Sequence, residues 1–71
     1  MDNIYQRLVD HFHGQTATAT KLEVDQSTVS GWVRGLHGMS PAVAVRAEKA
    51  SSGVFSRRDL CPSFPWEEFA A

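Results

Sequence analysis

The sequence contains only one cysteine, Cys61, and lacks any hydrophobic run longer than a few residues. A single cysteine excludes an intramolecular disulfide, and the short apolar runs exclude a membrane-spanning helix. Residues 1–12 carry acidic side chains and no continuous apolar stretch, so they do not resemble a signal peptide. We therefore expect a cytoplasmic protein without a membrane partner, in which Cys61 packs as a small apolar side chain.

Patterns for metal binding and catalysis are also lacking. The histidines are His11, His13 and His37, and on a helix the first two would point about 200° apart, whereas helical metal ligands are spaced at i, i+4. No nucleophile elbow, phosphate-binding loop or pair of catalytic carboxylates is present. We therefore expect no metal, no cofactor and no enzymatic activity.

The sequence lacks the excess of basic residues that is usual in nucleic-acid-binding domains. Its formal net charge is −1, from seven basic and eight acidic residues. The charges are unevenly distributed, because residues 1–58 hold every basic residue and carry +2, whereas residues 59–71 carry −3. A nucleic acid would therefore be expected to contact the first part of the chain, and its non-specific binding should be weak.

The composition is that of a small, soluble globular domain, with 42% hydrophobic and 21% charged residues. A chain of 71 residues forms a single domain with a modest core, so dimerisation would add stability. We expect one domain over residues 1–61. Residues 62–71, with two prolines and an acidic, aromatic end, are expected to form a loosely attached tail.

Helix signals recur along the domain. Ile4, Leu8 and Phe12 form one stripe of an amphipathic helix that Asp2 or Asn3 can cap.

Further helices are predicted over residues 15–22, from the cap Asp25 until Gly35 ends the helix, and from Ser40-Pro41 to residue 50. One more turn is predicted after Ser56. The fold class is therefore all-α, a four- to five-helix bundle with a possible short extended segment near residues 53–56.

Residues 15–34 have the pattern of a helix-turn-helix unit, in which two helices cross steeply and the second enters the major groove of DNA. The crossing requires a small residue in the first helix, an apolar residue in the turn and two apolar residues on the inner face of the second helix. These positions carry Ala19, Val24, Val29 and Trp32. The spacing therefore predicts a helix-turn-helix motif.

The same segment, QTATATKLEVDQSTVSGWVR, resembles the helix-turn-helix of phage Cro-type repressors and of the related YdaS-type antitoxin family. The likeness continues through Met39-Ser40-Pro41, Arg46-Ala47-Glu48, Gly53-Val54 and Arg57-Arg58-Asp59-Leu60-Cys61-Pro62. The resemblance implies a Cro-like or lambda-repressor-like fold. It also implies a regulator that acts on an operator near its own gene.

Two positions depart from the family pattern. Glu23 stands in the turn where the family usually has glycine with a positive φ, and a side chain there costs about 1 kcal/mol. Gly31 stands on the second helix where the family often has a longer polar residue. It lowers helix propensity, and we expect it to remove one possible contact with a base.

The candidate DNA contacts follow from which side of the second helix faces inward. With Val29 and Trp32 buried, polar side chains are left on the outer face, and glutamine pairs with adenine whereas serine and threonine reach bases or phosphates. The residues predicted to read bases are Gln26, Ser27 and Ser30. The residues predicted to contact the DNA backbone are Gln15, Thr28, Arg34, Lys21 and His37. The alternative is that this face is only solvated.

Two functions remain open from the sequence. The first is a Cro-like transcriptional regulator that binds a pseudo-palindromic operator in double-stranded DNA as a homodimer. The second is a protein-interaction or antitoxin-type module whose aromatic, acidic tail docks on a partner protein through Phe64, Trp66 and Phe69. The same three residues and Phe55 are candidates for the dimer interface.

Overall fold

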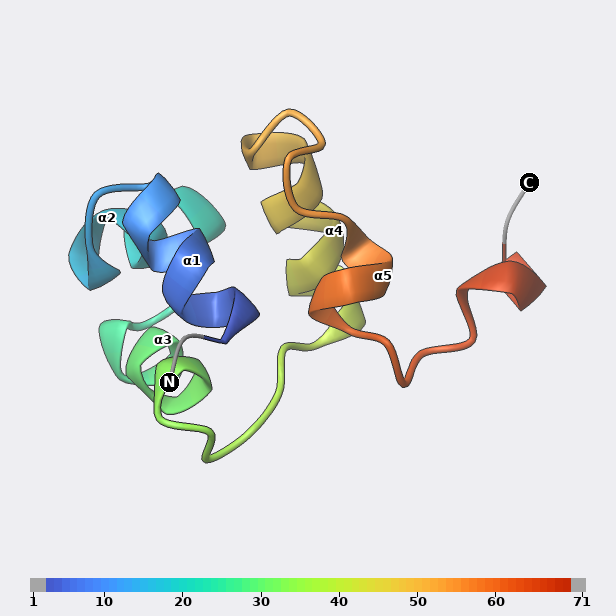
Figure 1. Ribbon diagram of the computed structural model, residues 1–71, viewed down its shortest axis with the longest axis horizontal. Coiled ribbons are helices and arrows are strands. Elements are labelled where there is room, and N and C mark those ends of the chain that lie inside the picture. Colours follow the sequence, from blue (N-terminus) through green and yellow to red (C-terminus); the bar gives the residue numbers. More distant parts are fainter. Residues whose placement is uncertain (1–2, 70–71) are drawn as a thin grey trace.

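The computed structural model describes residues 3–69, apart from the side chain of Phe69. Within this range the chain forms five α-helices and one short 3₁₀ helix (Figure 1). They are α1 (Ile4–His11), α2 (Gln15–Leu22), α3 (Gln26–Val33), α4 (Pro41–Ala50), α5 (Arg57–Leu60) and η1 (Trp66–Phe69). The all-α prediction is therefore confirmed. The described residues contain no strand. In the segment near residues 53–56, where the sequence allows a short extended stretch, residues 53–55 form a turn and bends and Ser56 caps α5.

Polar side chains cap three of the helices at the predicted positions. The side-chain oxygen of Asn3 accepts a hydrogen bond from the backbone N–H of Gln6 at 2.8 Å. The Ser56 hydroxyl accepts from two backbone N–H groups of α5, at 3.0 and 3.4 Å. Ser40 caps α4, which has Pro41 in its first turn. Asp25 occupies the cap position of α3, but its carboxylate makes no capping hydrogen bond.

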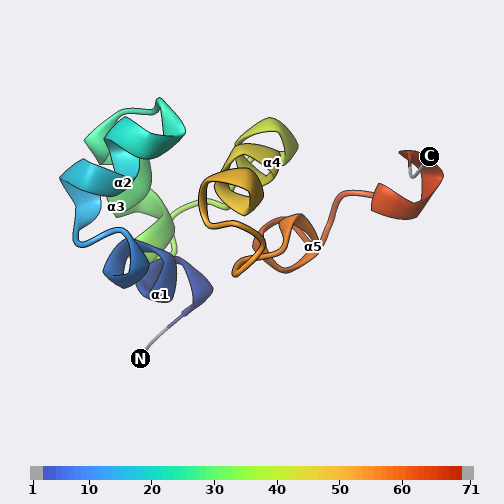
Figure 2. The ribbon, with the colours of Figure 1, turned by 90° about the horizontal axis from the view of Figure 1, so that it is seen from above.

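The core lies where all five helices meet. Leu8 and Phe12 of the predicted amphipathic stripe are buried, Ile4 is half-buried, and Cys61 is 7% exposed and packs as a small apolar side chain, as expected. α1 packs against α2, α3 and α5, while α4 packs against α2 and α5. Figure 2 shows α1, α2 and α3 grouped together, with α4 and α5 beside them and η1 beyond α5.

A charged hydrogen-bond cluster joins α4 to the start of α5. The Glu48 carboxylate accepts from Nε of Arg57 at 2.7 Å and from its backbone N–H at 3.1 Å. The side-chain hydrogen bond from Arg57, followed by the backbone one, lowers the pKa of Glu48. Glu48 is therefore a structural residue that fixes where α5 begins.

We expect this cluster to contribute about 1 kcal/mol to stability near neutral pH and to lose that contribution in acid. Because the folded-state pKa of Glu48 lies below its unfolded value, the contribution is complete above the unfolded pKa and disappears as the pH falls through the folded pKa. Urea denaturation of the wild type and Glu48→Gln over a pH series measures this. The two stabilities should converge in acid, and a constant difference would contradict the linkage.

The exposed pair of Arg58 and Glu67, joined at 3.4 Å, provides the control. The Glu67 side chain is 87% exposed, so solvent screens this pair. The Glu67→Gln variant should therefore match the wild type at every pH.

Candidate nucleic-acid interface

Helices α2 and α3 and the turn between them form the two-helix unit that the sequence predicts. Of the positions assigned to its interior, Ala19, Val29 and Trp32 are buried and Val24 in the turn is half-buried. The turn begins at Glu23, which adopts a left-handed conformation with φ 57° and ψ 45°. The backbone N–H of Val24 donates to the carbonyl of Ala19 at 3.0 Å and closes the end of α2.

The left-handed conformation of Glu23 predicts a stabilising substitution. Because glycine adopts this conformation without steric cost, Glu23→Gly should raise the free energy of unfolding by about 1 kcal/mol. Thermal or urea denaturation measures the gain. Glu23→Ala is the control, since alanine removes the charge but keeps the strain. An equal gain in both variants would assign the effect to the carboxylate instead.

Two long-range hydrogen bonds join the two-helix unit to other parts of the chain. The guanidinium of Arg46 on α4 donates from Nη1 to the carbonyl of Leu22, the last residue of α2, at 2.6 Å. The Asn3 amide before α1 donates from Nδ2 to the carbonyl of Val33, the last residue of α3, at 3.3 Å. Both bonds satisfy carbonyls that a helix end leaves without a partner. Sequence reasoning missed both roles, because the paired residues are far apart along the chain.

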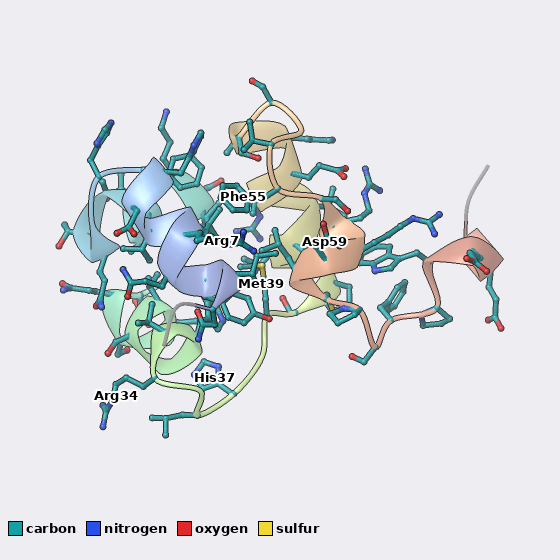
Figure 3. The ribbon with its side chains drawn as sticks, viewed as in Figure 1. Arg7, Arg34, His37, Met39, Phe55 and Asp59 are labelled. Carbon is teal, nitrogen blue, oxygen red and sulfur yellow. The ribbon has the colours of Figure 1, made fainter. Side chains whose placement is uncertain are left out.

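The outer face of α3 is polar and accessible. Gln26 and Ser27 are exposed, and Thr28 and Ser30 are half-buried. Within residues 3–69 none of these four side chains makes a hydrogen bond, so their donors and acceptors are available. Arg34 is exposed at the end of α3, and Figure 3 shows its side chain projecting away from the helix. We call Gln26, Ser27 and Ser30 the reading face.

The remaining predicted backbone contacts lie on α2 and in the loop after α3. Gln15 is the first residue of α2 and is half-buried, next to backbone N–H groups at the helix N-terminus. Lys21 is exposed in the last turn of the same helix. His37 is exposed, and Figure 3 shows it beside α3.

The sequence predicts only that Gly31 lowers helix propensity and removes one possible contact with a base. In the structure Gly31 is buried. The reason is that the His37 ring lies directly on it, so a Cβ at Gly31 would overlap the imidazole. The space of the missing side chain is therefore filled from the following loop.

Comparison with known proteins decides the family. The model of the family described as bacterial toxin YdaS matches residues 5–69, which include the whole two-helix unit. The chain belongs to the YdaS family. It is also 62% identical to the regulatory protein cro of Pseudomonas phage D3 over 71 residues, which cover all of this chain and 97% of that protein. No solved structure gives a significant match.

The acidic end of this YdaS-family chain lies away from α2 and α3. In both Figure 1 and Figure 2, η1 lies beyond α5, on the far side from the two-helix unit. Glu67 and Glu68 are in this segment. These two carboxylates are therefore not located at the reading face.

Aromatic contacts join the end of the chain to α5. The Trp66 indole donates from Nε1 to the carbonyl of Cys61 at 2.8 Å, and the Arg57 guanidinium lies 5.7 Å from the centre of the indole ring. The ring of Phe64 packs on that of Trp66, with 4.5 Å between their centres. Phe69 is predicted to contact a protein partner, but its side chain lies outside the described part of the structure, as do residues 70–71.

Within residues 3–69, no helix has the length and apolar character that crossing a membrane requires. The same residues contain no group of three or more His, Cys, Asp or Glu side chains that could hold a metal ion.

Proposed function

We propose that this chain is a sequence-specific transcriptional regulator that binds double-stranded operator DNA and is not an enzyme. The observation that carries the proposal is the contrast between the two sides of α3. Val29 and Trp32 fix its inner side in the core, while Gln26 and Ser27 on its outer side are exposed and have no side-chain hydrogen bond within residues 3–69. A rigid helix with an available polar face suits insertion into the major groove. The similar protein of phage D3 is named regulatory protein cro.

The proposed contacts are of two kinds: contacts with base edges that read the sequence, and contacts with phosphates that position the helix. Gln26 pairs with adenine through its amide, and Ser27 and Ser30 reach the neighbouring base edges. Thr28, Arg34, Lys21 and Gln15 contact phosphates on either side of the groove and set the register of the helix.

Dimeric binding follows from the size of this face. One short helix contacts only a few base pairs, so useful specificity requires two copies of the chain. Two copies related by a two-fold axis would place their α3 helices in successive major grooves, about 34 Å apart, on a pseudo-palindromic site. We propose such a homodimer on DNA, acting in the cytoplasm on an operator close to its own gene.

Fluorescence anisotropy with duplex DNA tests the proposal. The probes are a labelled duplex from the region upstream of the gene and a scrambled duplex of equal composition. The wild type should bind the first more tightly, and Gln26→Ala should weaken that binding about tenfold. Gln6→Ala is the matched control, because Gln6 lies on α1 and its side-chain amide donates to Asp10 at 3.0 Å. Equal binding of both duplexes by the wild type would contradict sequence reading.

A second function rests on the aromatic pair at the end of the chain. Phe64 and Trp66 are half-buried and border a shallow surface cleft together with Pro62, Pro65 and Arg58. An aromatic surface with flanking acids suits a protein partner, as in an antitoxin-type module. Failure of the wild type to bind either duplex at low salt would favour this surface as the functional one.

A further inference from the structure

The loop after α3 inserts a side chain into the outer surface of that helix. His37 lies six residues beyond Gly31, and its ring points at the glycine with Nε2 nearest to the place a Cβ would occupy. The other ring nitrogen, Nδ1, lies 3.3 Å from the carbonyl oxygen of Gly38. His37 is nevertheless exposed to solvent, so the ring both fills the gap and remains accessible.

Helix geometry places this ring next to the reading face. Gly31 follows Ser27 by four residues, and residues at i and i+4 are neighbours on one side of a helix. The imidazole of His37 therefore continues the row that Ser27 begins, one turn further along α3. A base edge that approaches Gly31 would meet this ring and not bare backbone.

We propose that His37 acts as a base-reading residue, in place of the side chain that Gly31 lacks. The proposal rests on the proposed function, and it changes the role of His37 from a phosphate contact to a determinant of sequence preference. Nε2 is directed at Gly31 and Nδ1 at the carbonyl of Gly38, so the ring meets a base through its face and carbon edge, which suit apolar contact with the methyl group of thymine.

Selection from a pool of randomised duplexes tests this, with the full chain and sequencing of the bound DNA. The wild type should enrich a motif with two half-sites. His37→Ala should lose the preference at one base pair in each half-site, keep the other preferences, and bind the wild-type motif about tenfold more weakly. Leu36→Ala is the control from the same loop, because Leu36 is 65% exposed, and it should select the wild-type motif.

A double-mutant cycle tests whether Gly31 is what positions His37. Gly31→Ala adds the Cβ that overlaps the ring, so it should weaken binding in the wild-type background and have little effect in the His37→Ala background. An unchanged motif in His37→Ala, or equal losses in both backgrounds, would overturn the proposal. If the wild type enriches no motif, the proposed function itself fails, and this outcome is distinct from the other two.

Discussion

The Trp32→Ala variant is expected to lose about 3–5 kcal/mol of stability, which leaves most of the protein unfolded at 25 °C. Trp32 is 2% exposed and is among the largest fully buried side chains. It packs beside the ring of Tyr5, with 6.1 Å between ring centres, and so joins α3 to α1. A single hydrophobic core of this size rarely supplies more than about 3–5 kcal/mol in total. The loss is therefore comparable to the whole free energy of unfolding.

Far-UV circular dichroism with urea denaturation measures this effect. The Trp32→Ala spectrum should lose most of its helical signal without denaturant. Val54→Ala is the control, since Val54 is 65% exposed and its truncation should change stability by less than about 0.5 kcal/mol. A Trp32→Ala protein with wild-type helicity and an unchanged urea midpoint would show that α3 is not held by this side chain.

Local sequence signals predicted the helices well, because each signal acts within a few residues. The cap at Ser40 with Pro41 gives the start of α4, and Ser56 gives the start of α5. The exposed side of α3 could also be predicted, because burial of Val29 and Trp32 leaves only one side for polar residues. DNA contact by that side stays a prediction.

The features that were missed depend on groups that meet only after folding. The hydrogen bond from Arg46 to the carbonyl of Leu22 joins residues 24 positions apart, and no local pattern indicates it. The His37 ring over Gly31 is a second example, because a glycine in a helix signals only low propensity until a neighbouring loop is seen to fill its space. The hydrogen bond from the Trp66 indole to the Cys61 carbonyl likewise forms only because the chain turns back after α5.

We expect the affinity for operator DNA to depend on salt concentration with a slope set by the number of positively charged side chains near the reading face. The proposed phosphate contacts include only two permanently charged residues, Lys21 and Arg34, both exposed. A dimer would thus neutralise four phosphates, so log K should fall with log salt at a slope of about −3.6. Between 50 and 200 mM salt the affinity should fall by about 150-fold.

Anisotropy titrations at four salt concentrations measure the slope, and two variants test its source. Arg34→Gln removes one cation from each protomer, so the slope should become shallower by about 2 units per dimer. Lys49→Gln is the control, because Lys49 is exposed on α4 rather than on the two-helix unit, and its slope should equal that of the wild type. A wild-type slope near −2 would indicate that one protomer binds alone. If the slope is unchanged in Arg34→Gln, the phosphate contacts lie on another surface. The orientation of α3 on DNA proposed above would then be wrong.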